Sequence, residues 1–514
     1  MKAADLILKN ANVITLNPAQ PTAELIAIKD GKILLVADNE SLASVRGSKT
    51  KVIDCHGKTI IPGFNDAHCH VFSFVRKLLG IDLSPPLVKS INEIRAIISR
   101  KAQNTPPGKW ISGTDYTDFY LAEKRHPTLR DIDEVAPNHP VILSHRSLHT
   151  CVLNSKALAL AGITRETSAP PGGVIERDAN GEPTGVLFEM LGYIREKVMP
   201  PLSEAELNKG IALANEQYLS QGITSLGEAT IVNSLKQWQK FRSFKEKDQL
   251  KCRVYFMPGI EALSQFQEAG LTFGSGNADL RLGSVKIAPN ETTGKLHPSQ
   301  PELNQMVLKA HRAGFQLAIH AVQPGTVEAA IVALEYAQSQ FPQSGRRHRI
   351  EHCSVCPPHL LERLKRLKTV IATQPPFLYY SGERYLATLP PNQLQWIARF
   401  KSFFDAGLVV AGSSDSPIVP ANPLVGIYAA ITRQTESGQK LLPEESISAS
   451  QALAMYTING AYATFEERIK GSITPCKLAD IVILSDDSTK VPPEQLKDIK
   501  VLTTIIGGKV VWET

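Results

Sequence analysis

The stretch Thr59-Ile-Ile-Pro-Gly-Phe-Asn-Asp-Ala-His-Cys-His70 carries a β-rich run directly into two histidines that are one residue apart. Alternate side chains of an extended segment point to the same side, so the imidazoles of His68 and His70 can meet at one point. That arrangement suits two ligands of one metal ion. An isolated pair of this kind is about as often a pair of polar loop residues, so the rest of the chain has to decide between the two interpretations.

Downstream of this stretch, β-rich runs alternate with amphipathic helical patterns. Apolar residues recur at three- and four-residue spacing in segments such as 303–313 and 326–339, which predicts helices. Strands that alternate with helices predict parallel βαβ units, and their number fits an α/β fold of the (β/α)8 or TIM-barrel type. The β-rich runs cover residues 141–144, 224–226, 253–257, 282–287, 316–319, 349–350, 369–372 and 409–411.

Both ends of the chain consist of short β-rich runs and tight turns, such as Lys29-Asp30-Gly31-Lys32 and Gly507-Gly508. We predict that residues 1–61 and 475–514 form one small β-sandwich domain and that residues 62–474 form the barrel. The region of about 73–199 holds more elements than one strand-to-helix connection needs. It is therefore predicted to be an insertion after the first barrel strand, placed to cover the active site.

Composition narrows the classes of protein. Hydrophobic residues make up 43% of the 514 residues and charged residues 21%, which are ordinary globular values. A net charge of +6, spread over the chain, favours neither nucleic-acid binding nor an anionic membrane, and no run reaches the roughly 18 apolar residues of a membrane helix. Seven scattered cysteines indicate reduced thiols, so we predict a cytoplasmic protein, with a homodimer as the default assembly.

Three further polar residues stand at the ends of strand-like runs: His320, His352 and Asp415. Catalytic groups of such barrels occupy the carboxyl ends of the strands. Each of the three, taken alone, is as well explained as a buried polar residue with a satisfied hydrogen bond. Their occurrence together, in order, after His68 and His70, favours a metal site.

Lys286 lies inside the apolar run of residues 282–287, where a charged amine is costly. Burial lowers the pKa of a lysine, and a neutral amine can react with carbon dioxide to give a carbamate. Such a carbamate would be an anionic bridge between two divalent ions. The alternative is a structural lysine held in an ion pair.

These segments together resemble the amidohydrolase superfamily and, within it, the family-3 branch that contains N-substituted formamide deformylases. The resemblance extends through four more segments, so it covers nearly the whole chain. The matching segments are Gly63–His70, Lys286, His320, Arg349-Ile-Glu-His352, Ser414-Asp415, and residues 147–155, 170–186, 222–225 and 456–461.

The resemblance implies a two-metal hydrolase. In that pattern one ion is held by His68, His70 and Asp415, a second ion is held by His320 and His352, and a carbamate on Lys286 bridges them. Two Zn²⁺ ions are the expected cofactors by ligand type. Asp415 would act as the general base and then as the acid in hydrolysis of an amide-like, non-peptide carbon–nitrogen bond of a small molecule.

Two departures from the family pattern concern the pocket rather than the reaction. Relatives usually carry an acid soon after the bridging lysine, here displaced to Glu291, and a Gly-Asp-Arg run after the third histidine, here Ala321-Val-Gln-Pro-Gly325. Candidate substrate contacts are Arg146, His149 and Gln323. The identity of the substrate stays open.

Two alternatives remain for the function. A mononuclear deaminase of a heterocycle uses similar histidines, but usually with a glutamate at the position of Gln323. A barrel without catalysis that binds a ligand is disfavoured by the presence of all six ligand-type residues.

Overall fold

The computed structural model describes residues 3–514, which divide into two compact units. The first unit contains the described residues up to His70, Asn215–Ala288 and Leu303–Thr514. The second contains Val71–Ala214 and Pro289–Glu302. The predicted insertion of residues 73–199 lies within the second unit, whereas no pattern in the sequence indicated that residues 289–302 would join it.

Two fully parallel sheets lie in the first unit, with the orders β17-β16-β15-β8 and β18-β19-β20-β21-β22. Almost every residue in these strands is buried, as expected for parallel strands that are covered on both faces. The predicted α/β class with parallel strands is therefore confirmed. The strands are β8 (Phe64–Cys69), β15 (Ile223–Glu228), β16 (Arg253–Phe256), β17 (Leu280–Leu282), β18 (Val285–Ile287), β19 (Leu317–Ala321), β20 (Arg349–His352), β21 (Val370–Thr373) and β22 (Val409–Gly412).

The expected single strand over residues 282–287 is interrupted. β17 ends at Leu282 and pairs with β16, whereas β18 begins at Val285 and pairs with β19. At the break, the N–H of Gly283 donates to the carbonyl of Phe256 at 2.7 Å, and a side chain at Gly283 would come within 2.2 Å of the Tyr255 ring. The chain can therefore pass this point only with a glycine.

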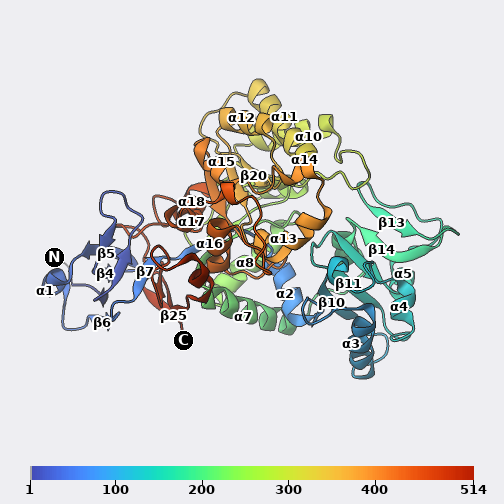
Figure 1. Cartoon of the computed structure of the whole chain (residues 1–514), viewed down its shortest axis with the longest axis horizontal. Coiled ribbons are helices and arrows are strands. Elements are labelled where there is room, and N and C mark those ends of the chain that lie inside the picture. Colours follow the sequence, from blue (N-terminus) through green and yellow to red (C-terminus); the bar gives the residue numbers. More distant parts are fainter. Residues whose placement is uncertain (1–2) are drawn as a thin grey trace. The chain divides into compact units, whose positions relative to one another are not determined.

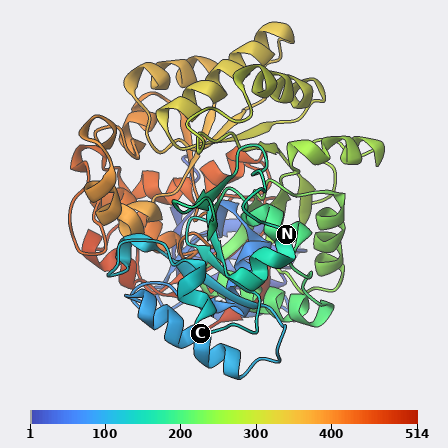
Figure 2. The same cartoon turned by 90° about the vertical axis from the view of Figure 1, so that its right-hand side faces the viewer.

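A proline stands in the first turn of four of the helices that follow the parallel strands, α11, α12, α13 and α16. Proline fits there because the first amide of a helix has no partner inside the helix. Figures 1 and 2 show α11 and α12 on the outer side of β19 and β20. The helices that lie wholly or largely in the first unit are α1 (Leu42–Val45), α8 (Leu235–Glu246), α9 (Leu263–Glu268), α10 (Gln300–Arg312), α11 (Pro324–Gln340), α12 (Pro358–Leu367), α13 (Pro376–Thr388), α14 (Pro391–Leu394), α15 (Phe400–Asp405), α16 (Pro423–Thr432), α17 (Ala449–Met455) and α18 (Ile458–Ala463).

Strands from the two ends of the chain meet in one sheet of the order β25-β24-β23-β7-β2-β3. β7 runs antiparallel to β23, with Pro62 opposite Ile481. A second sheet, β5-β4-β1-β6, shares a buried core with the first. The strands are β1 (Leu6–Lys9), β2 (Asn12–Ile14), β3 (Thr22–Ala23), β4 (Leu25–Lys29), β5 (Lys32–Ala37), β6 (Lys51–Asp54), β7 (Thr59–Pro62), β23 (Ile481–Leu484), β24 (Val501–Ile506) and β25 (Lys509–Glu513).

The second unit is built on a six-stranded sheet of the order β13-β14-β12-β11-β10-β9. The run over 141–144, which the sequence placed among the alternating strands, is β11 of this sheet and not a member of the two parallel sheets. The elements are β9 (Ile81–Asp82), β10 (Ile111–Tyr116), β11 (Val141–His145), β12 (Thr150–Leu153), β13 (Val174–Arg177) and β14 (Pro183–Phe188), with α2 (Val71–Leu79), α3 (Ile91–Gln103), α4 (Leu129–Asp133), α5 (Ser155–Ala161) and α6 (Leu191–Lys197). α7 (Glu204–Ser220) belongs to both units.

Among the described residues, none of the helices combines the length and the apolar character that a membrane crossing requires.

Candidate metal centre

His68 lies at the carboxyl end of β8 and is fully buried. Its Nδ1–H donates to Oε2 of Glu351 at 2.5 Å. Glu351 is held in turn by Arg349, whose Nε and Nη2 donate to the two carboxylate oxygens at 2.7 and 2.9 Å. This chain of contacts fixes the tautomer of His68 and leaves the lone pair of Nε2 free for a ligand.

His70 follows the end of β8 and is oriented in a similar way. Its Nδ1 lies 3.0 Å from Oγ1 of Thr230, and the backbone N–H of Thr230 donates to Glu228 at 3.0 Å. The other ring nitrogen, Nε2, lies 2.9 Å from Oδ1 of Asp415. The free ring nitrogens of the two histidines therefore face one carboxylate.

Asp415 lies just beyond the carboxyl end of β22, and its N–H donates to the carbonyl of His68 at 2.8 Å. Its Oδ1 lies 3.5 Å from Nε2 of His68, and the donor atoms of His68, His70 and Asp415 all lie within 4.8 Å of one another. Oδ1 is buried and, apart from its contact with Nε2 of His70, makes no hydrogen bond within the part of the chain that the structure describes. Two imidazole lone pairs and an unsatisfied carboxylate oxygen that face one point fit a divalent ion with nitrogen and oxygen ligands, such as Zn²⁺.

His352 and His320 lie beside this group. Nδ1–H of His352 donates to Gln374 at 2.8 Å, and the ring of His352 lies 4.9 Å from that of His68 and 4.4 Å from that of His320. Both histidines are thus near the centre, but neither belongs to the group of three described above. The backbone is strained at two of these positions, since φ is +72° at His352 and +56° at Asp415.

Lys286 on β18 places its Nζ 3.5 Å from Nε2 of His68. Burial lowers the pKa of Lys286 to about 8, although the nearby carboxylates of Glu351 and Asp415 act in the opposite direction. No carboxylate of the described chain lies within ion-pair distance of Nζ, which disfavours the interpretation as an ion-paired structural lysine.

The protonation states of these side chains favour metal binding. Burial lowers the pKa of His352 to about 4 and holds that of His68 well below its usual value. Burial alone would raise the pKa of Asp415, but the interaction with His70 and the neighbouring imidazoles outweighs it, and the pKa falls below its usual range. Neutral imidazoles and an ionised carboxylate are the forms that bind a metal ion.

Several buried polar residues that support these side chains were missed by the sequence analysis. Arg349 and Glu351 point to the same face of β20 and are fully buried, although the sequence motif that contains them was noted without a role for either. Asp66 accepts hydrogen bonds from Ser414, and burial raises its pKa to about 6. The signal in the sequence was the presence of charged residues inside predicted strands, since such residues require partners when the strand is buried.

The three predicted substrate contacts are divided between the two units. Arg146 and His149 lie in the second unit, where Nδ1 of His149 is 3.0 Å from Glu189. Gln323 is exposed at the N-cap of α11, and its N–H donates to Thr326 at 3.2 Å. Helix capping accounts for Gln323, and contact of the three residues with substrate remains a prediction.

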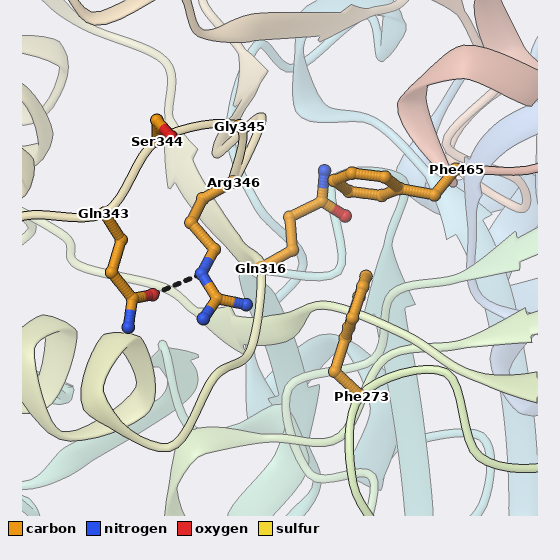
Figure 3. A pocket seen from close by; sticks show the side chains of 7 residues that line it. All are labelled: Phe273, Gln316, Gln343, Ser344, Gly345, Arg346 and Phe465. Carbon is orange, nitrogen blue, oxygen red and sulfur yellow. Dashed lines mark hydrogen bonds between the residues drawn. The ribbon is translucent and has the colours of Figure 1, made fainter.

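A cavity of about 270 Å³ lies at the other end of the same strands, beside Phe273, Gln316, Arg346 and Phe465 (Figure 3). Gln316 immediately precedes β19 and Arg346 comes shortly before β20, whereas His320 and His352 are at the carboxyl ends of these strands. In Figure 3 the Arg346 side chain turns toward Gln343, to which it donates a hydrogen bond. This cavity is therefore separate from the metal centre.

Comparisons with known proteins place the chain among hydrolases. The model of the amidohydrolase family matches residues 51–512. The N-substituted formamide deformylase of Arthrobacter pascens is 28% identical over 99% of this chain and 98% of its own. The crystal structure of an uncharacterised metal-dependent hydrolase from Pyrococcus furiosus has a TM-score of 0.72 and 26% identity, covering 94% of this chain and 100% of its own. A second such hydrolase, from Pyrococcus horikoshii, has a TM-score of 0.75 and 24% identity, covering 95% and 99% of the two chains.

Proposed function

Since the chain belongs to the amidohydrolase family and is a metal-dependent hydrolase of carbon–nitrogen bonds other than peptide bonds, we propose that His68, His70 and Asp415 hold its metal and that its substrate is a small N-acyl amine. The observation that carries this proposal is the convergence of three donor atoms within 4.8 Å around an unsatisfied oxygen of Asp415. An N-formyl amine is the first substrate to test, because the relative from Arthrobacter pascens is a formamide deformylase.

When bound, the metal would supply Lewis-acid polarisation of the attacking water and of the carbonyl under attack. Asp415 then accepts the proton of the water, because its lowered pKa keeps it ionised at neutral pH. The same carboxyl returns this proton to the nitrogen as the carbon–nitrogen bond breaks, which releases a carboxylic acid and an amine. Glu351 and Thr230 keep the two histidines in the orientation that the metal needs.

The proposal extends to a second ion held by His320 and His352, with a carbamate on Lys286 between the two ions. The support is the amine of Lys286, which has a lowered pKa and lies 3.5 Å from Nε2 of His68. The neutral amine attacks carbon dioxide, a carbon–nitrogen bond forms, and the amine loses one proton to leave an anionic carbamate. Zinc is the ion that we propose by ligand type.

The proposed architecture is a closed eight-stranded barrel in which β17 and β18 together make one strand. A parallel bridge between Gly259 and Lys286 and the hydrogen bond from Asp415 to the carbonyl of His68 link the two parallel sheets on their two sides. For the terminal strands we propose one β-sandwich domain of residues 1–61 and 475–514, supported by the core that the two sheets share. Residues 62–474 are then the barrel with its insertion.

Metal analysis of the purified chain, combined with a panel of N-formyl, N-acyl and cyclic amides, tests the function. We expect two zinc ions per chain and release of amine from at least one N-acyl amine. Treatment with a chelator should remove the zinc and abolish the release of amine. Lys286→Met is expected to lower the metal content and the turnover. The matched control, Lys490→Met, changes a side chain that is 73% exposed and should alter neither.

A deaminase would give a different result in the same experiment. It would bind one ion, would be indifferent to Lys286→Met, and would release ammonia from an amino-substituted heterocycle. The exposed, helix-capping Gln323 at the position where deaminases usually carry a glutamate favours the amide hydrolase.

A further inference from the structure

Three arginines of the second unit, Arg76, Arg146 and Arg195, form no salt bridge with any described residue. Arg195 on α6 is the most constrained. Its Nη1 donates to Oγ of Ser73 at 3.3 Å and its Nη2 to Oγ of Ser144 at 3.4 Å, which are long contacts to two neutral hydroxyl groups. A guanidinium that is partly buried normally faces a carboxylate, because the hydroxyls do not balance its charge.

The other two arginines are directed to the same place by the elements that carry them. Ser73 and Arg76 are three residues apart on α2, so they lie on one face of that helix. Ser144 lies in β11, and Arg146 directly follows the last residue of that strand, where its N–H donates to the carbonyl of Tyr116 at 2.9 Å. Since Arg195 bonds both serines, Arg76 and Arg146 border the surroundings of its guanidinium.

The electrostatic state of this group, called here the arginine cluster (Arg76, Arg146 and Arg195), is unfavourable without a ligand. Burial and the charge of Arg76 lower the pKa of Arg195 to about 10. Glu206 attracts Arg76 only from a distance, while its carboxylate accepts hydrogen bonds from Ser203. Nε of Arg146 is buried and makes no hydrogen bond among the described residues. Neighbouring Lys77, in contrast, is paired with Asp115 at 2.6 Å.

We propose that the arginine cluster is a binding site for a carboxylate. A planar carboxylate matches the fork of a guanidinium in a bidentate contact, and the hydroxyls of Ser73 and Ser144 can donate to the same anion. The ligand is a small carboxylic acid that is held by side chains of the second unit alone.

Binding is tested on the full chain with propionate as the probe. Propionate should raise the melting temperature more than sodium chloride of the same ionic strength, which controls for screening. In Arg195→Gln this difference should vanish, while the melting temperature without propionate stays equal or rises, because a repelling charge has been removed. A merely structural Arg195 would give a lower melting temperature instead. The control, Arg130→Gln, changes an arginine of the same unit that is 82% exposed and should keep the propionate effect.

Absence of any propionate effect beyond that of salt in the wild-type chain overturns the proposal, whatever the chain hydrolyses.

Discussion

The amino and carboxyl ends of the parallel strands in the first unit differ in how fully their buried polar groups are hydrogen-bonded. At the amino ends of β19 and β20, Gln316 uses its full hydrogen-bonding capacity, accepting from Tyr255 and Ser284 and donating to two backbone carbonyls. At the carboxyl ends, Asp415 keeps an unsatisfied oxygen, and its backbone and that of His352 are strained. The chain itself therefore completes the amino ends of these strands, whereas the carboxyl ends are incomplete without a ligand.

The histidines at the two ends of the strands differ in the same way. At the amino ends, Leu317 N–H donates to Nδ1 of His348, so Nε2–H of His348 donates to Nδ1 of His311 at 3.0 Å, and Nε2–H of His311 donates to Phe341 at 2.8 Å. Every ring nitrogen of this pair has a partner within the chain. His68 and His70, in contrast, each use one nitrogen for a chain partner and direct the other toward Asp415.

Among substitutions at the carboxyl ends of the strands, Asp415→Asn should cause the largest loss of activity. Asparagine fills the same space but cannot take a proton from water, so kcat should fall by roughly 10²–10⁴-fold. The melting temperature should fall only a little, because asparagine keeps the shape of the side chain and loses only the favourable interaction of the charge with the neighbouring imidazoles. Steady-state kinetics and thermal unfolding measure both. Asp405→Asn, an exposed control paired with Lys401, should leave both unchanged, and a strongly reduced melting temperature for Asp415→Asn would contradict the contrast between the two ends.

Glu351→Gln, at the same ends of the strands, should weaken metal binding and have a smaller effect than Asp415→Asn. The amide oxygen can still accept from Nδ1 of His68, but the charge that polarises the imidazole is lost, and so is the ion pair with Arg349. Metal affinity should fall by about 10–100-fold, as for other groups that orient a ligand histidine. Titration with a competing chelator measures the affinity. Glu328→Gln, which changes an exposed carboxylate near Arg363, serves as the control. An unchanged affinity in Glu351→Gln would show that the backbone alone orients His68.

A substitution at the amino ends of the strands should change only the stability of the fold, and this is the smallest of the expected effects. Burial lowers the pKa of His348 to about 3, from an ordinary value of 6.5. Between about pH 3 and pH 6.5, His348 is therefore neutral in the folded chain and protonated in the unfolded chain. The free energy of unfolding that is present above about pH 6.5 decreases as the pH falls toward 3. The expected slope is at most about 1.4 kcal/mol per pH unit.

His348→Gln should reduce this slope in urea unfolding experiments below pH 6.5, with kcat at neutral pH unchanged. His56→Gln, an exposed histidine, provides the matched control. A loss of activity in His348→Gln that exceeds the loss of folded protein would contradict the separation of the two ends.

The sequence predicted the strand runs and the residues at their ends because both leave local patterns. Apolar runs end in His320, His352 or Asp415, and the structure brings these residues to the neighbourhood of His68. Contacts between distant segments leave no such pattern, so the pairing of Glu351 with His68, the support of His70 by Thr230, and the membership of residues 289–302 in the second unit were not predictable. The break between β17 and β18 depends on Gly283 passing the Tyr255 ring, which is likewise a contact of the folded state.

The pairing of Pro62 with Ile481 has a consequence for the order of synthesis. β7 leads through one residue, Gly63, into the strand that carries His68, yet its antiparallel partner β23 is made about 420 residues later. At about 5–20 residues per second, the ribosome needs about 20–80 s to synthesise that interval. His68 and His70 are therefore synthesised early, but the sheet next to them is completed only near the end of synthesis. A metal ion can thus bind these two histidines in the nascent chain before the folded site exists.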